Sequence, residues 1–296
     1  MHTYLKAVGF SGIETQADLE ELIKKVLSQP DSRTVGVINE KCSIIEYRKD
    51  FSAGIGVAVR GEEDESGNFH YSHLFPYLRG EEVSTFEEVF IHKKVDTDAY
   101  TGMCDDARLG ISLIFYLQNV AEFIEKDKEI PFPAPVPVKM SALVKSGTVI
   151  LPTQKRVFTR IAAKLDQEIK NRAMEEARNG DREAMEWLTM NDIDKYAVVS
   201  ERIKKEDLFS IVDTTFIPFG SESDVYNVLA NILSAKQLFN TETGERIWLL
   251  RLNCNDLIFD ACINTKDLLG EPFPGMRFRG TIWMQGIAEF ENTIKK

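Results

Sequence analysis

Hydrophobic and polar residues alternate most clearly in the last third of the chain, between Gly244 and Gly286. The alternation runs through Ile247–Cys254, Leu257–Asn264 and Phe278–Met284. A period of two is typical of strands that bury one face. This region therefore predicts a small antiparallel sheet or barrel.

The Asn255-Asp256 pair between the first two of these strands predicts a two-residue hairpin loop. That register places Arg251 opposite Asp260 on one face, and Cys254 and Cys262 on opposite faces without a disulfide. The residues predicted for the buried face are Trp248, Leu250, Leu252, Phe259, Ala261 and Ile263.

The first 78 residues predict one helix on an antiparallel sheet. The helix begins at Thr15 or Gln16, ends at the Gln29-Pro30 step, and carries an apolar stripe from Leu19 to Leu27. Strands are predicted at 4–10, 34–38, 43–47, 54–60 and 69–75, the last two joined as a hairpin.

The segment from 89 to 151 predicts further strands at 89–95 and 110–117 and a short helix at 119–128. Four prolines between Pro131 and Pro137 favour an extended connection. A second hairpin is predicted around Ser146-Gly147, between strands at 138–144 and 148–151.

The composition changes at Thr153, where helical spacing replaces alternation. A helix that starts there should end at Asn179-Gly180, and Asp181 should cap the next one. A third charged helical stretch covers 192–206. Beyond it the pattern predicts a strand at 209–219 and a helix at 223–238, capped by Ser221 or Ser223.

Together these elements predict an α+β fold with antiparallel sheets, packed helices, a helical connector and a C-terminal β-rich, barrel-like unit. Three units are expected: an N-terminal α+β unit at 1–152, the connector at 153–208, and a C-terminal helix plus antiparallel β unit at 209–296.

The charge balance limits the partners that we expect. The net charge of −11 disfavours nucleic acid and anionic membranes, which need a basic surface. The longest apolar run, 109–117, is too short to span a bilayer. The N-terminus lacks a secretory signal pattern and the four cysteines form no CxxC motif, so we expect a cytoplasmic protein with reduced thiols.

Several long blocks resemble a family of uncharacterised clostridial proteins of about this length, a domain of unknown function. The blocks are GIGVAVRGEEDESGNFHYSHLFPYLRG, DAYTGMCDDARLGISLIFYLQN, EDLFSIVDTTFIPFGSESDVYNVL, NTETGERIWLLRLNCNDLIFDACINTKDLLGEP and GMRFRGTIWMQG. The resemblance implies a cytoplasmic bacterial protein. It implies no activity, cofactor or catalytic residue.

Histidines and acids offer little metal-binding chemistry. The four histidines, His2, His70, His73 and His92, form no HExxH or HxH motif. His2 could join a distant carboxylate, as in metal-binding glyoxalase-type modules, but a surface or hydrogen-bonding role is the favoured interpretation for the histidines. Asp96, Asp98, Asp105 and Asp106 lack calcium-loop spacing, and a turn with solvated acids is the favoured interpretation. We therefore expect no metal and no cofactor.

Other motifs favour structural roles over catalysis. Cys104 lies beside Asp105 and Asp106, which oppose formation of a thiolate. Gly54 and Gly56 lie in a predicted strand, where small residues allow close approach and do not form a phosphate loop. The basic residues of the connector alternate with acids, as on a solvated helix.

The C-terminal strands could form an oligonucleotide-binding type of barrel, whose binding face would hold Arg251, Arg277, Arg279, Trp283 and Gln285. Residues 216–287 contain six Lys and Arg against eight Asp and Glu, whereas a groove that follows nucleic acid is basic. We read Trp248 and Phe278 as core residues.

In the strand from Phe278, Gly280, Ile282 and Met284 point inward with it. Arg279, Thr281, Trp283 and Gln285 then point outward, and an outward tryptophan beside arginine and glutamine is typical of interface centres. We therefore predict a contact surface at Trp283, Arg279 and Gln285. The competing interpretation is that the 223–238 helix or the other domain covers Trp283.

The leading hypothesis is a non-catalytic protein that binds another protein or a small molecule, with no catalytic residue. The alternative is an enzyme of hydrolase or metal-dependent lyase type, whose site forms only in three dimensions. The sequence does not indicate an oligomeric state.

Overall fold

The computed structural model describes residues 3–40, 42–94, 99–127, 134–152, 172–177, 180–188, 190, 213–220 and 223–290. The chain forms two compact units. One consists of residues 1–150 together with 214–296, and the other consists of residues 151–213. No helix in the described ranges is long and apolar enough to cross a membrane.

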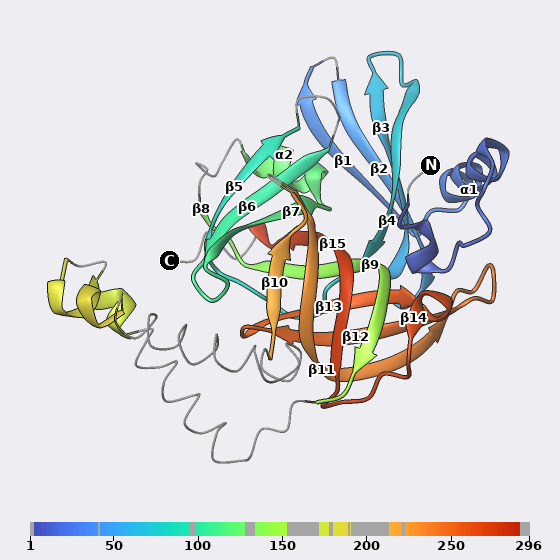
Figure 1. Cartoon of the computed structure of the whole chain (residues 1–296). Coiled ribbons are helices and arrows are strands. Elements are labelled where there is room, and N and C mark those ends of the chain that lie inside the picture. Colours follow the sequence, from blue (N-terminus) through green and yellow to red (C-terminus); the bar gives the residue numbers. More distant parts are fainter. Residues whose placement is uncertain are drawn as a thin grey trace. The chain divides into compact units, whose positions relative to one another are not determined.

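The N-terminal part of the first unit is a four-stranded antiparallel sheet, here called sheet A (Figure 1). Its strands, in order, are β1 (Ser32–Asn39), β2 (Cys42–Ser52), β3 (Ile55–Asp64) and β4 (Phe69–Leu78). All four were predicted from the alternation of the sequence.

Helix α1 (Gln16–Ser28) packs against β2 and β3 of sheet A. Its predicted start is confirmed, since the Thr15 hydroxyl accepts from the Asp18 N–H in a reciprocal capping box. Before it, the predicted strand at 4–10 is wrong: Leu5–Val8 forms the 3-10 helix η1, which ends at Gly9 with a φ of +88°.

Helix α2 (Val120–Asp127) lies against β1, a terminal strand of sheet A. Gly36 allows this approach, because a Cβ there would lie 2.6 Å from the Ala121 carbonyl oxygen. The Glu125 carboxylate accepts from the Val37 N–H at 2.8 Å. A helix that occupies the edge of a sheet in this way prevents pairing with another chain.

The C-terminal part closes into a five-stranded barrel. Its strands follow the ring order β11 (Val225–Phe239), β12 (Arg246–Cys254), β13 (Leu257–Asn264), β9 (Val138–Ile150) and β15 (Arg277–Ala288). Only β13 and β9 run parallel. This is the strand order of an oligonucleotide-binding (OB) barrel in which the usual last strand, here β9, comes first in the chain.

The barrel closes because β11 bends from one neighbour to the next. Residues 225–231 pair with β15 and residues 231–239 pair with β12, with a bulge between Ile232 and Ser234. The inward side chains of β11 are Tyr226, Val228, Ala230 and Ile232, all buried. Such a bulge increases the local bend that closure needs.

The remaining strands extend the barrel sheet. They are β5 (Glu88–Lys93), β6 (Tyr100–Asp106), β7 (Ile111–Leu117), β8 (Ala134–Pro135), β10 (Thr215–Pro218) and β14 (Leu268–Leu269), and the 3-10 helix η2 (Thr265–Asp267) precedes β14. β7 pairs in parallel with β15, and β10 pairs with β11. The sequence did not predict β6.

The structure joins segments that the sequence assigns to separate units. β9, from the predicted 1–152 unit, pairs with β13 and β15 from the predicted 209–296 unit. β7 also pairs with β15. Because backbone hydrogen bonds connect the two ends of the chain, they share one compact unit, and the intervening residues form the second.

The helix predicted at 223–238 is wrong, because these residues form β11. The segment carries two periodicities at once. Val225, Val228, Leu229, Ile232 and Leu233 fit a helical stripe, whereas the inward residues of β11 fit a strand. Pairing with β12 and β15 decides in favour of the strand.

The hairpin predicted at Ser146-Gly147 is also wrong, since β9 continues unbroken through both residues. Gly147 is needed for the close approach of the Phe278 ring to the backbone, and not for a turn. A Cβ on Gly147 would lie 2.4 Å from the Phe278 ring, which packs over it inside the barrel.

In the second unit, the predicted helix break near Gly180 is confirmed. Residues 172–177 and 182–188 are helical, and Gly180 between them has a φ of +90°. The Asp181 carboxylate accepts from the N–H groups of Glu183 and Ala184. Residues 153–171 and the helix predicted at 192–206 lie outside the described ranges.

The predicted β12–β13 register is confirmed. Arg251 pairs with Asp260, Leu252 with Phe259 and Cys254 with Leu257. The Arg251 guanidinium lies 3.7 Å from the Asp260 carboxylate, and all four cysteines are free. Trp248 packs at the margin of the buried face, where the other five predicted residues are fully buried.

Asn255 and Asp256 both adopt positive φ, 51° and 64°, as a two-residue type I′ turn requires. Asp256→Gly should therefore raise the free energy of unfolding by about 0.5–1 kcal/mol, because glycine reaches this region without a Cβ clash. Chemical denaturation checks this. Asp256→Val should shift stability the other way, and equal stability of the two variants would contradict the turn assignment.

Candidate functional site

The outer face of the barrel carries an uncharged row of side chains, here called the apolar row. Trp283 of β15 lies opposite Leu143 of β9, Leu143 opposite Cys262 of β13, and Cys262 opposite Leu249 of β12. Residues opposite one another share a face of the sheet, so the row crosses four strands. It contains an aromatic ring, two aliphatic side chains and a thiol.

A polar row lies beside it on the same face. Here Gln285, Ser141, Asp260 and Arg251 are successive partners across β15, β9, β13 and β12. Arg251, Trp283 and Gln285 therefore share one face of the barrel, the face that the sequence suggested for an oligonucleotide-binding type of barrel and disfavoured for nucleic acid on its charge. In OB barrels the corresponding face of the second and third strands binds ligands.

The N-terminal part of the chain covers this face. Leu5, Val8 and Phe10 join the core that contains Trp283, Leu143 and Cys262, together with α1 and sheet A. The Tyr4 ring stacks on Trp283 at 5.4 Å, and Tyr116 of β7 lies 5.0 Å from it. Trp283 is only 6% exposed.

The predicted exposed contact at Trp283, Arg279 and Gln285 therefore needs correction. Trp283 and Gln285 are buried, and only Arg279 is exposed. The predicted outward direction of Trp283 is right relative to Phe278, since the two join different cores. Its cover consists of the N-terminal residues and β7, which belong to the predicted 1–152 unit, so the competing interpretation is right about the other domain and wrong about a 223–238 helix.

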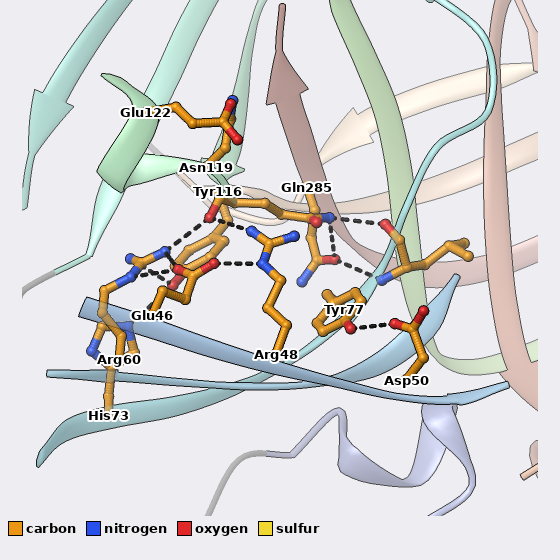
Figure 2. Close-up of polar contacts among 12 residues, drawn as sticks. Glu46, Arg48, Asp50, Arg60, His73, Tyr77, Tyr116, Asn119, Glu122 and Gln285 are labelled. Atoms are coloured by element: carbon orange, nitrogen blue, oxygen red, sulfur yellow. Dashed lines mark hydrogen bonds and ion pairs between the residues drawn. The ribbon is translucent and has the colours of Figure 1, made fainter. Parts of the chain in front are cut away.

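Sheet A meets the barrel through a buried charge network (Figure 2). Arg60 donates to one oxygen of Glu46 from Nε at 2.9 Å and from Nη2 at 2.6 Å. Arg48 donates to the other oxygen. Both guanidiniums also donate to the backbone oxygen of Gln118, at 2.8 and 3.0 Å, which ties β2 and β3 to the segment after β7.

Tyr116 extends the network towards β4. Arg60 Nη1 donates to the Tyr116 hydroxyl at 3.2 Å, and His73 Nε2 lies 3.1 Å from the same oxygen. Because the guanidinium donates to the phenol oxygen, the geometry fits a phenol that donates its own proton to His73. The Arg60 guanidinium also lies over the Phe75 ring at 4.8 Å.

The buried groups of the network keep fixed charges near neutral pH. Burial opposes ionisation of Glu46, but the two guanidiniums outweigh it and hold the pKa of this carboxyl below its ordinary value. Tyr77 borders the network, since the Arg48 guanidinium lies 5.1 Å from its ring. Burial raises the pKa of the Tyr116 and Tyr77 phenols well above their ordinary value. Glu46 is therefore a carboxylate and both phenols stay protonated, so the network joins two sheets and offers no general base among these three groups.

Side-chain amides complete the junction at β4, the other terminal strand of sheet A. Gln118 Nε2 donates to the Leu78 carbonyl and Gln285 Nε2 to the Pro76 carbonyl, each at 2.9 Å. The two amides also bond to each other at 3.0 Å. They take the place of a neighbouring strand, so the role of Gln285 is internal.

The thiols are not poised as nucleophiles. Burial raises the pKa of Cys104 and of Cys254 to about 12, and raises the pKa of Cys262 as well. Cys104 lies in β6, not in the predicted turn, and neighbouring Asp106 is buried and bonded to Arg108 at 2.6 Å. Asp106 is thus paired and not solvated, whereas Asp105, directly after Cys104, is exposed as predicted and accepts from the Ser112 hydroxyl at 2.6 Å.

The other residues considered for metal or phosphate binding are histidines, acids and glycines, and those that the structure describes make packing or hydrogen-bonding contacts. His70 of β4 bonds to Asp64, the last residue of β3, at 3.0 Å beside the exposed turn of this hairpin. No group of three or more His, Cys, Asp or Glu side chains in the described ranges could hold a metal ion. His2, Asp96 and Asp98 lie outside these ranges. Gly56 admits the Tyr77 ring, as its predicted packing role requires, whereas Gly54 lies in the β2–β3 turn with a φ of +67°.

Residues 5–286 match a family described as a domain of unknown function from an E. rectale gene, DUF3881. The chain belongs to this family. The match confirms the resemblance seen in the sequence and spans both the covered barrel face and the Glu46–Arg60 network. No curated protein and no solved structure matches the chain. Membership of DUF3881 therefore carries no activity over to these residues.

Proposed function

We propose that the protein acts by binding another protein, without chemistry of its own. The observation that carries this proposal is a set of three exposed large apolar side chains at one end of the barrel, Leu233, Leu269 and Phe273, here called the apolar end. Their exposed fractions are 43%, 72% and 49%. Large apolar side chains exposed together are typical of partner contacts.

Hydrogen bonds and strand pairing hold these side chains at one end of the barrel. The loop that contains Phe273 bonds back to β11 beside Leu233, through Gly275 N to the Ile232 oxygen and Ile232 N to the Met276 oxygen, each at 2.8 Å. Leu269 pairs with Thr148 near the end of β9. The apolar end therefore rests on paired strands, which suits a preformed contact surface.

Affinity capture with the double variant Leu269→Ser/Phe273→Ser tests this proposal. A partner captured by wild type is purified and its affinity is measured by calorimetry. We expect binding at least tenfold weaker for the variant, because truncating a central apolar contact costs about 1–2 kcal/mol or more. Phe86→Ser is the matched control, since Phe86 is 69% exposed between β4 and β5.

Equal affinity of wild type and the double variant would remove the apolar end from the proposal. Turnover of a metabolite by the purified protein, abolished by one polar substitution, would replace binding with the hydrolase or lyase alternative. The negative net charge supports a protein partner over nucleic acid or an anionic membrane.

A further inference from the structure

Residues 4–11, here called the strap, lie on the apolar row much as a bound peptide lies in its site. Tyr4 stacks on Trp283, and Leu5, Val8 and Phe10 are buried in the core shared with Cys262 and Leu143. The strap joins α1 through residues 12–15, so within the described chain it is tethered on its C-terminal side. Its only regular structure is the single turn of η1.

Side chains of the barrel hold the backbone of the strap by its carbonyl oxygens. Asn240 Nδ2 donates to the Val8 oxygen at 2.8 Å, and the Thr243 hydroxyl donates to the Gly9 oxygen at 2.7 Å. Asn264 Nδ2 donates to the Lys6 oxygen at 3.2 Å. Peptide-binding sites commonly combine hydrogen bonds to the peptide backbone with apolar contacts to its side chains. The strap makes both kinds of contact with the barrel.

We propose that the strap occupies, within its own chain, a binding face for an apolar peptide that makes a single helical turn, and that the strap opens from that face as a unit while the barrel stays folded. The row beneath it is uncharged, which suits an apolar peptide and not a nucleic acid. The position of the row on β12, β13 and their neighbours is the ligand face of an OB barrel. This surface shares no residue with the apolar end, although Lys6 of the strap pairs with Asp267, two residues before Leu269, so the inference uses different side chains from that site.

Two buried cysteines on opposite faces of the barrel wall make the opening measurable. Cys262 lies under the strap, whereas Cys254 lies inside the barrel core. Alkylation by iodoacetamide, followed residue by residue with mass spectrometry, reports strap opening at Cys262 and unfolding of the barrel at Cys254. In the wild-type protein Cys262 should react at least about tenfold faster than Cys254 under native conditions.

The variant Asn240→Asp removes one hydrogen bond to the strap and keeps the other hydrogen bonds of this side chain. Its carboxylate still accepts from the N–H groups of Glu242 and Thr243, as Asn240 Oδ1 does, but the donor to Val8 is lost. Cys262 alkylation should become about 10- to 100-fold faster, and Cys254 alkylation should change much less. Asn253→Asp is the control, because its side-chain oxygen accepts from Asp256 N in a hairpin away from the strap.

A synthetic peptide of residues 1–15 completes the test. Added in excess to the Asn240→Asp protein, it should slow Cys262 alkylation and leave Cys254 unchanged. Equal rates at Cys262 and Cys254 in the wild type would overturn strap opening. A peptide without effect on Cys262 in the variant would overturn the binding face. Neither result bears on the apolar end, so failure of this inference remains distinct from failure of the proposed function.

Discussion

Glu46→Gln is expected to lower the free energy of unfolding by about 3–5 kcal/mol, the largest effect of a single charge change in the described part of the chain. Glu46 is the carboxylate between two buried guanidiniums, and Arg60 and Glu46 side chains are only 1% and 3% exposed. Without its charge, Arg48 and Arg60 face each other in a poorly solvated site. Chemical denaturation of wild type and variant measures the loss.

The exposed pair Arg33–Glu63 provides the matched control. It joins the same residue types at 3.3 Å, but its side chains are 44% and 34% exposed. Glu63→Gln should therefore cost at most about 1 kcal/mol. Similar losses for Glu46→Gln and Glu63→Gln would contradict a buried network.

The pH dependence of Glu46→Gln has a definite sign. Because the pKa of Glu46 is lowered in the folded protein, its contribution is complete above the ordinary carboxyl pKa and is lost as the pH falls through the folded value. The stability difference between wild type and variant should thus be constant near neutral pH and shrink in acid. A difference that grows on acidification would contradict this charge assignment.

Trp283→Ala should cost about 3–5 kcal/mol, the usual range for removing a large buried aromatic side chain. The variant loses contacts with both Tyr4 and Tyr116 and leaves a cavity under the strap. Trp187→Ala is the control, because Trp187 is 40% exposed in the second unit and should change stability by less than about 1 kcal/mol. Thermal and chemical unfolding report both values, and a loss below 1 kcal/mol for Trp283→Ala would contradict its burial.

Local patterns were sufficient to predict much of the fold. The Asn255-Asp256 turn and the alternation around it determine the β12–β13 register, and Thr15 with Asp18 determines the start of α1. Long-range pairing was not predictable in this way. β11 carries helical and strand periodicities together, and only its partners β12 and β15 decide between them.

For the candidate site too, local patterns were predictable from the sequence and long-range contacts were not. The alternation of the strand correctly placed Trp283 and Phe278 on different faces of the sheet. It does not show that residues 4–11, more than 270 positions earlier in the chain, cover Trp283. Glu46 and Arg60 were missed because each looks like an ordinary polar residue in an alternating strand. One feature of the sequence could have indicated the network. Arg60 directly follows the apolar run Ile55–Val59, and a charged residue in such a buried strand needs a buried partner.

The barrel face that holds Trp283 is an internal interface, covered by the N-terminal segment. Acrylamide quenching of Trp283 fluorescence in the Trp187→Phe/Trp248→Phe protein tests it most directly, because Trp283 is then the only tryptophan. We predict emission typical of a buried indole and quenching many-fold weaker than in the denatured protein. Native quenching as strong as that of the denatured chain would show an exposed face and contradict the account.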